Sequence, residues 1–283
     1  MTIDFTLTTY KKLLVAIKQS GYAFYTFEEW CRGVAQGRYV ILRHDVDSKA
    51  GNSLTIAGIE AEMGIRATYY FRIVPRSNQP EIIRAIAGLG HEIGYHYEDL
   101  SLFSGDTEKA YDHFKMQLEY FRCFYPVKTI FMHGSPTSKW DNRDLWKTYN
   151  YRDLGIIGEP YLDLLIQPEI TYFTDTARMW DGTNYNVRDK QQVSTEQQSD
   201  EKEFTPTQQR VSNCSDRSIH STFDLINLFE TAPAQQIIMI TTHPQRWTDN
   251  SAEWFMEIWQ QYLKNKIKKL IIKFKGINIK LSN

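Results

Sequence analysis

Paired cysteines and long hydrophobic runs are missing from the sequence. Its three cysteines in 283 residues are Cys31, Cys123 and Cys214, and none belongs to a CxxC pair. Neither a disulfide framework nor a zinc knuckle is indicated, and unpaired cysteines suit a reducing compartment. No stretch approaches the roughly 18 consecutive apolar residues that a transmembrane helix needs. Residues 1–22 mix charged with apolar side chains, unlike a secretory signal, so we expect a cytoplasmic protein.

An excess of charge of either sign is also missing. Thirty-three Lys and Arg residues balance thirty-four Asp and Glu residues, which gives a net charge of −1. A general nucleic-acid binder usually carries a basic excess, so we expect no nucleic-acid partner. A hydrophobic share of 42% and a charged share of 24% are typical of a globular protein with a sizeable core. The aromatic share of 14% serves mainly that core, and it also suits a site that faces carbohydrate.

The spacing of apolar residues alternates between strand-like and helix-like along the chain. Strands are predicted at 39–42, 67–71, 92–95, 128–132, 154–157, 170–173 and 237–241, and helices at 8–20, 53–63, 80–89, 107–124, 222–230 and 252–265. This alternation indicates βα units and a parallel sheet. The polar segment 191–217 has few large apolar residues, and we expect it to be a disordered insertion within one domain spanning residues 1–283.

Polar residues gather where the predicted strands end. The clusters are Arg43 to Asp47, His91 to Asp99, His133 to Pro136 and His243 to Trp247, and they hold five of the seven histidines. In a parallel barrel the carboxyl ends of all strands meet on one face, where barrel enzymes build their sites. Aspartate and histidines from separate strands form a metal-ligand set, with a carboxylate left for acid–base chemistry. Each cluster also has a structural interpretation, such as an ion pair between Arg43 and Asp45.

Three of these segments resemble the motifs of one family. Leu42-Arg-His-Asp-Val-Asp47 resembles a first motif with two strand-end aspartates, and Gly90-His-Glu-Ile-Gly-Tyr-His96 resembles a second motif that leads to a metal-binding histidine. Thr242-His-Pro244 resembles the late histidine that serves as the catalytic acid. Over nearly its whole length the chain is therefore similar to the polysaccharide deacetylase superfamily, carbohydrate esterase family 4, with the NodB-like fold. The resemblance implies an α/β fold, a distorted (β/α) barrel of about seven parallel strands, and a role in bacterial surface-polysaccharide metabolism.

The chain departs from the family pattern at three places. Val46 separates two aspartates that are adjacent in family members. Leu100 stands where a second metal-binding histidine is expected, four residues after the first. His133-Gly-Ser-Pro136 replaces an Arg-and-Pro motif at the fourth strand. The third metal ligand must therefore come from another position, for which His133 and Glu98 are the candidates.

The activity implied by the resemblance is metal-dependent hydrolysis of an N-acetyl group on an amino sugar, with zinc as the expected divalent metal and a carbohydrate as substrate. The residues assigned to the metal are Asp47, His96 and His133, and those assigned to catalysis are Asp45 as base and His243 as acid. The residues assigned to the substrate and its surroundings are Arg43, Glu98, Arg246, Trp247, Asp175 and Arg178. The alternatives are a metal-free hydrolase of C–N bonds on the same fold, which Leu100 would permit, and an inactive barrel that binds a glycan.

Two further segments have both a structural and a functional interpretation. Asp141 is expected to cap a helix that starts near Asn142, whereas Asp175 and Arg178 favour a supporting role beside the site. If so, replacing Asp175 by Asn lowers turnover and leaves thermal stability nearly unchanged. Residues 264–283 hold seven lysines, no acidic residue and several isoleucines. Such a tail can contact an anionic membrane surface, but we favour a last element whose apolar residues join the core.

Overall fold

The structure, a computed structural model, describes residues 3–134, 138–164, 166–167, 169–180, 219–231, 236–263 and 265–266. The predicted insertion at 191–217 and residues 267–283 of the basic tail lie outside the described residues. No helix within the described ranges is long and apolar enough to cross a membrane.

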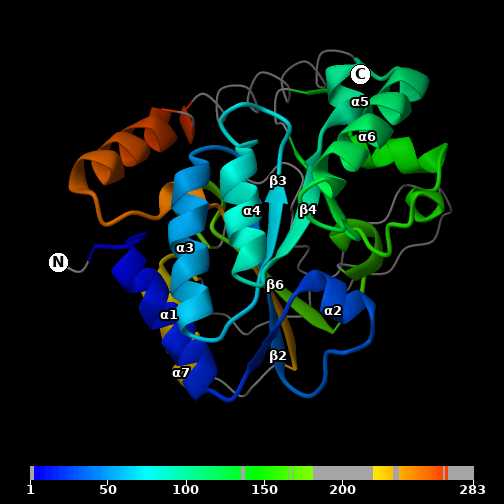
Figure 1. Cartoon of the computed structure of the whole chain (residues 1–283). Coiled ribbons are helices and arrows are strands. Elements are labelled where there is room, and N and C mark those ends of the chain that lie inside the picture. Colours follow the sequence, from blue (N-terminus) through cyan, green and yellow to red (C-terminus); the bar gives the residue numbers. More distant parts are fainter. Residues whose placement is uncertain are drawn as a thin grey trace, which may run out of the picture.

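A parallel sheet forms the centre of the fold (Figure 1). Its strands are β1 (Ala23–Tyr25), β2 (Tyr39–Val46), β3 (Thr68–Phe71), β4 (Glu92–Tyr97), β5 (Ile130–Met132), β6 (Ile170–Thr174) and β7 (Ile237–Thr242). Six of them follow the order β5-β4-β3-β2-β7-β6, and β1 pairs with β2 off this path. All pairings between these seven strands are parallel, so their carboxyl ends meet along one edge, as the alternation of elements predicts.

Contacts of Arg43 on β2 show that the sheet is curled. Strands β5 and β6 occupy the two ends of the six-strand path, and in a flat sheet five spacings would hold them roughly 24 Å apart. Yet the Arg43 guanidinium lies 3.4 Å from the ring centroid of Phe131 on β5 and 3.4 Å from the hydroxyl of Tyr172 on β6. One side chain can reach both ends only because the sheet wraps around it. The architecture is therefore an α/β half-barrel of six strands, compatible with the predicted barrel.

Helices surround the half-barrel. They are α1 (Leu7–Gln19), α2 (Phe27–Cys31), α3 (Ala50–Glu62), α4 (Pro80–Gly88), α5 (Asp99–Leu102), α6 (Thr107–Arg122), α7 (Thr222–Thr231) and a last helix at residues 251–263. Helices α1, α3, α4 and α7 lie together on one side of the sheet (Figure 1). Local sequence explains their starts: Thr6 caps α1 by accepting from the Thr9 amide, and Thr26 forms a capping box with Glu29 at α2.

Short helical turns follow the later strands. They are η1 (Asn142–Lys147), η2 (Tyr151–Leu154), η3 (Pro160–Leu164), η4 (Thr176–Arg178) and η5 (Pro244–Arg246). Asp141 accepts a hydrogen bond from the Arg143 amide at 3.0 Å, which confirms it as the cap of η1. The predicted strand at 154–157 is wrong, since Leu154 ends η2 and Gly155 adopts a left-handed conformation with φ of 70°. The run forms no strand, although the Ile157 amide donates to the carbonyl oxygen of Lys128 at 2.8 Å and Gly158 forms a single parallel bridge with Thr129.

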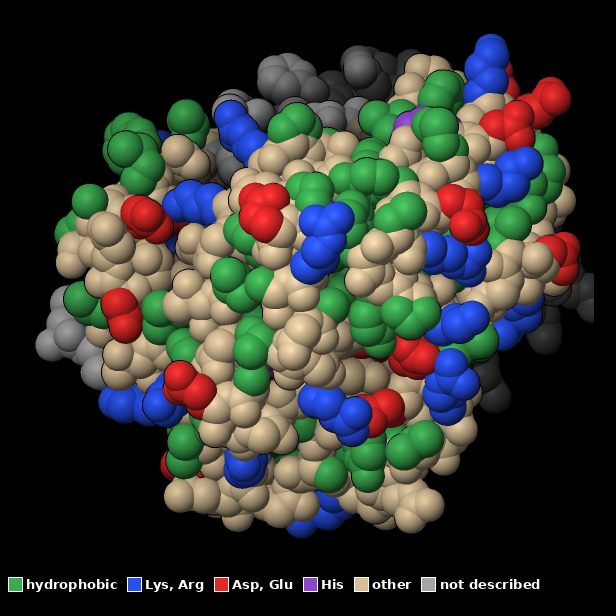
Figure 2. Space-filling model, in the orientation of Figure 1, with side chains coloured by type: hydrophobic (Ala, Val, Ile, Leu, Met, Phe, Trp, Pro, Cys, Tyr) green, Lys and Arg blue, Asp and Glu red, His purple; other side chains and the backbone are tan. Residues whose placement is uncertain are grey.

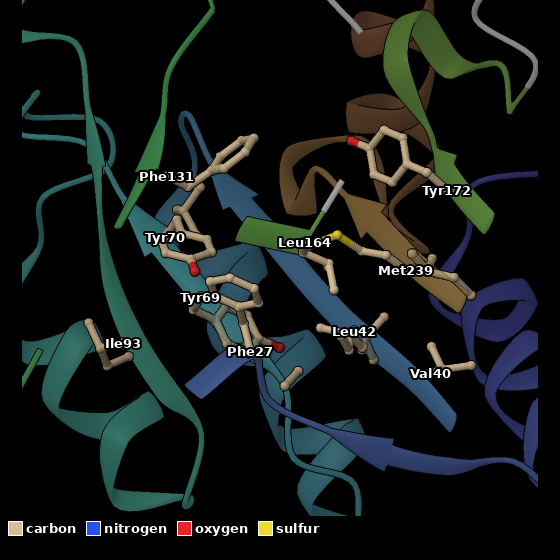
Figure 3. Close-up of a cluster of buried hydrophobic side chains, with 14 of the residues drawn as sticks. Phe27, Val40, Leu42, Tyr69, Tyr70, Ile93, Phe131, Leu164, Tyr172 and Met239 are labelled. Atoms are coloured by element: carbon tan, nitrogen blue, oxygen red, sulfur yellow. The ribbon is translucent and has the colours of Figure 1, made fainter. Parts of the chain in front are cut away.

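Side chains of the strands and of η3 fill the interior of the half-barrel. Figure 3 shows Tyr70, Phe131, Leu164, Tyr172 and Met239 gathered in one cluster of buried residues. The interior of the half-barrel is therefore filled by buried side chains, and the polar residues lie at the carboxyl edge of the sheet.

Candidate metal and acid–base site

Three predicted metal ligands converge at the carboxyl edge of the sheet. Asp47 follows β2 directly, His96 lies in β4, and His133 follows β5. The Oδ1 atom of Asp47 lies 3.2 Å from Nδ1 of His133 and 3.7 Å from Nε2 of His96. The same two ring nitrogens are 3.2 Å apart, and one ligand atom from each residue falls within 4.8 Å of the others. Separate strands therefore deliver an Asp/His/His cluster of the size that one ion needs.

The orientation of these side chains fits a divalent metal. Nδ1 of His96 lies 3.0 Å from the carbonyl oxygen of Phe131, which fixes the ring and turns Nε2 toward the cluster. The buried Oδ1 atom of Asp47 has no hydrogen-bond partner of good geometry among the described residues, although His133 lies close to it. One carboxylate and two imidazoles are a zinc donor set that leaves a fourth position for water or substrate.

The protonation states suit the same interpretation. Burial raises the pKa of Asp47, but the three histidines around this carboxylate outweigh burial and hold its pKa well below the ordinary value. Burial lowers the pKa of His96 to about 3, so its imidazole is neutral at physiological pH. A metal ligand must be an ionised carboxylate or a neutral imidazole, and both conditions are met without a metal.

Glu98 stands behind His133. The Arg72 guanidinium holds this carboxylate through three hydrogen bonds of 2.6, 2.8 and 3.0 Å. Oε2 of Glu98 lies 3.9 Å from Nε2 of His133, on the side of the ring away from Asp47. Leu100, at the position expected for a histidine, is buried in α5. Of the two candidates for the third ligand, His133 joins the cluster and Glu98 supports it from behind.

A histidine–aspartate pair lies across from the ligands. Nδ1 of His243 lies 2.6 Å from Oδ1 of Asp175, and Nε2 of His243 lies 4.0 Å from Oδ2 of Asp47. Asp175 is fully buried and accepts from Arg246 at 2.6 Å and from the Trp247 indole at 2.9 Å. Burial raises the pKa of Asp175, but the charges of Arg246 and His243 outweigh it and lower the pKa to about 2. An ionised carboxylate thus orients the imidazole toward the ligand cluster.

The turn after Asp175 is strained. Ala177 and Arg178 have φ values of 62° and 60°, in the left-handed region that disfavours residues with a side chain. The amide of Arg178 donates to the carbonyl oxygen of Asp175 at 3.0 Å, and its guanidinium pairs with Glu257 at 2.7 Å. Strain of this kind persists where the surroundings enforce it and is common beside functional sites. Here the two contacts of Arg178 enforce the strained turn that directly follows Asp175.

Asp45 lies deeper in the half-barrel than the ligands. Its Oδ1 atom is 3.1 Å from Nε of Arg43, and Oδ2 accepts from the same guanidinium at 3.2 Å. Both residues lie inside β2 and point into the concave side of the sheet, whereas the prediction placed them after the strand. The charges of Asp45 and Asp47 both raise the pKa of His96, but burial outweighs them.

Two residues predicted to contact the substrate are buried beneath the site instead. Trp247 is 0% exposed and packs against Phe5 and Tyr10, with ring centroids 4.9 and 5.1 Å apart, so its assignment as a sugar contact is wrong. Arg246 is also buried, and its guanidinium is engaged by Asp175. Each belongs to the support of Asp175 because apolar packing and the buried ion pair leave no face for a substrate.

Two of the five clustered histidines also face elsewhere. His44 projects from the outer face of β2 and lies 2.8 Å from the carboxylate of Glu60 in α3. His91 stands before β4, at its amino end, and contacts the carbonyl oxygen of Ala57 at 3.0 Å. Both are fully buried and satisfied, which makes them parts of the packing between sheet and helices.

Three residues of the site had no role assigned to them from the sequence. Arg72 follows β3 directly, so the rule that polar residues gather at strand ends could have found it. Gln245 donates to Oδ2 of Asp47 at 3.4 Å. The buried Asn142 donates to the carbonyl oxygen of His133 at 2.8 Å and so fixes the backbone of that ligand. The last two come from turns whose course the sequence pattern does not indicate.

Comparison of the chain with protein-family models and with curated proteins gives no match.

Proposed function

We propose that the protein is a metal-dependent hydrolase that removes an N-acetyl group from an amino sugar of a polysaccharide or glycan precursor, on a seven-strand NodB-like barrel. The observation that supports this proposal is the Asp47, His96 and His133 cluster with the His243–Asp175 pair opposite it. A metal set alone also suits structural sites. Ligands that face an oriented imidazole, with a second carboxylate nearby, suit hydrolysis at a polarised carbonyl.

The residues divide the chemistry between two sides of the cluster. Asp47, His96 and His133 would hold a zinc ion, which supplies a polarised carbonyl and a water of lowered pKa. Asp45 is the carboxylate left to accept the proton of that water, and Arg43 holds it in place through two contacts. His243 protonates the departing amine, because Asp175 stabilises the charged imidazolium through Nδ1 and leaves Nε2 directed at the site.

Acetate release from N-acetylated amino-sugar oligomers tests the proposal. The purified protein is measured as isolated, after chelation, and after addition of zinc back to the chelated protein. We expect release that chelation removes and zinc restores, together with about one zinc per chain by metal analysis. Release that survives complete removal of metal would instead favour a metal-free hydrolase, and stoichiometric glycan binding without release would favour an inactive barrel.

Paired variants locate the chemistry. Asp45→Asn and His243→Gln are expected to abolish release, each by about 100-fold or more, while the zinc content stays the same. Asp47→Asn is expected to lose both acetate release and bound zinc, because the Asp47 carboxylate is the anionic ligand. Loss of zinc in Asp45→Asn with full zinc in Asp47→Asn would reverse the roles assigned to the two aspartates.

A further inference from the structure

The last helix, residues 251–263, exposes its apolar face to solvent and turns polar residues toward the protein. Five large apolar residues are exposed on it by 51–67%: Phe255, Met256, Trp259, Tyr262 and Leu263. We call this set the apolar stripe, because helical spacing places its members within about 120° of one another. Polar Glu257 and Gln261 face inward and are only 8% and 6% exposed. Amphipathic helices on globular proteins normally show the opposite arrangement.

Specific contacts fix the helix in this orientation. The inward Glu257 pairs with Arg178 at 2.7 Å, and the Arg178 guanidinium also lies 5.4 Å from the ring centroid of Trp254. The Trp254 indole donates to the carbonyl oxygen of Asp4 at 2.7 Å. Rolling the apolar stripe into the protein would break the ion pair and leave both of its charges in need of partners. Hydrophobic side chains are visible at the upper left of Figure 2, where Figure 1 places this helix.

The charge of the residues that follow the helix in the sequence indicates the kind of partner. Glu257 is the last acidic residue of the sequence, and seven lysines follow within residues 264–283. An apolar helix face with Trp and Tyr, continued by a segment with seven lysines and no acidic residue, has the composition that binds the interface of an anionic lipid bilayer. The aromatic rings suit the boundary between acyl chains and headgroups, and the lysines suit the headgroup charge.

We propose that the apolar stripe docks on an anionic membrane surface and that the lysines after it supply the electrostatic part of the attraction. A second copy of the chain is the less favourable occupant, since it would bring the same seven positive charges to the contact. The sequence does not predict the exposed apolar stripe, because the apolar periodicity of residues 252–265 indicates a helix packed on the core. Only the inward position of Glu257 and Gln261 shows which face is left outside.

Co-sedimentation of the full chain with vesicles tests the proposal. Vesicles of phosphatidylcholine with about 30% phosphatidylserine are compared with pure phosphatidylcholine, at about 0.1 M and 0.5 M salt. We expect binding to the anionic vesicles that falls at least about tenfold on removal of phosphatidylserine or at the higher salt. Replacing all seven lysines by Gln is expected to cause a comparable loss at low salt.

Substitution within the stripe supplies the decisive variant. Phe255→Ser combined with Trp259→Ser is expected to weaken binding at least about tenfold, and the exposure of both residues predicts an unchanged melting temperature. Leu102→Ser combined with Met116→Ser is the matched control, since these residues are 51% and 59% exposed on α5 and α6. We expect the control to bind within about twofold of the wild type.

Three results would overturn the proposal: no binding to anionic vesicles at low salt, binding unaffected by the stripe variant, and dimerisation through the stripe without vesicle binding. Sedimentation velocity without lipid detects the third. The acetate assay uses soluble donors, so the docking proposal stands or fails independently of the proposed hydrolysis.

Discussion

Asp175 and His243 meet across two neighbouring strands, with Oδ1 of the aspartate 2.6 Å from Nδ1 of the histidine. Asp175 follows β6 directly and His243 follows β7 directly, and Thr174 and Thr241 are partners in the register of these strands. The two side chains are thus brought together by parallel strands that end at the same level. A pair separated by 68 positions in the chain is a local feature of the sheet edge.

Asp175→Asn should lower both turnover and stability. An amide cannot stabilise the His243 imidazolium, so we expect turnover to fall about 100-fold and the pH dependence of turnover to change. The buried Arg246 would lose its charged partner, so we also expect a loss of roughly 1–3 kcal/mol in the free energy of unfolding. Burial thereby changes the sequence-based expectation of unaltered stability.

Steady-state rates across pH and thermal denaturation measure the two effects. Asp144→Asn, on the exposed surface of η1, is the matched control and should change neither. An unchanged pH profile with reduced stability would leave Asp175 a purely structural residue.

Acid should destabilise the protein through the same carboxylate. The pKa of Asp175 is about 2 in the folded protein against an ordinary value of 3.8. A carboxyl group with a lowered pKa stabilises the folded state at pH values above its ordinary pKa. That contribution is lost as the pH falls through the pKa of the folded state. We expect the free energy of unfolding to decrease between about pH 4 and pH 2, with a smaller decrease in Asp175→Asn. Denaturant titrations of both proteins at several pH values measure it, and equal decreases would contradict the assignment.

Removing the support of His133 should weaken metal binding less than removing the ligand. Glu98→Gln keeps the shape but loses the carboxylate that Arg72 clamps behind the imidazole, and we expect roughly 10-fold weaker zinc binding. His133→Ala should lose far more, because a three-residue donor set becomes two. Competition with a chromogenic chelator measures both affinities. The exposed His220 offers the control, His220→Ala, whose affinity should match the wild type. An Ala variant of His133 with wild-type affinity would point to another third ligand.

Gly94→Ala should destabilise the half-barrel. A Cβ atom there would lie 2.3 Å from Cε1 of Tyr70 and 2.9 Å from the carbonyl oxygen of Thr129, and the carbonyl belongs to the backbone. We expect a loss of about 1–3 kcal/mol in the free energy of unfolding, measured by chemical denaturation. Gly58→Ala is the control, since a Cβ on this glycine of α3 would meet nothing within 4 Å, and it should stabilise by about 0.5–1 kcal/mol. Equal effects of the two substitutions would contradict the close packing around Gly94.

Periodicity predicted six of the seven strands of the sheet and missed β1, which has only three residues, and it predicted the ends of strands less well. The apolar run at 39–42 indicated a strand, but β2 continues to Val46 because Arg43 and Asp45 pair with each other on the concave side. Charged residues inside a buried strand contradict the usual pattern, so the strand seemed to end early. The run at 154–157 failed for the opposite reason, since apolar residues also fill cores from irregular segments.

The candidate site residues were predicted correctly as neighbours where their position at the end of a parallel strand is enough to bring them together. Asp47, His96, His133 and His243 all stand at carboxyl ends of parallel strands, and this rule needs no knowledge of side-chain direction. The rule failed for His44, because alternate residues of a strand face opposite sides. It failed for Trp247 because burial depends on what packs above a turn, and nothing in the local sequence announces that the Phe5 ring lies there.

The position of His133 ties the integrity of the site to a short strand at one end of the strand path. β5 is a strand of three residues at the end of the path, and Phe131 within it pairs with His96 of β4. Edge strands open more readily than central ones, and a ligand that binds only the closed form slows that opening. Amide hydrogen exchange of β5 therefore reports occupancy of the site, and affinity for its ligand includes the free energy of keeping one sheet edge closed.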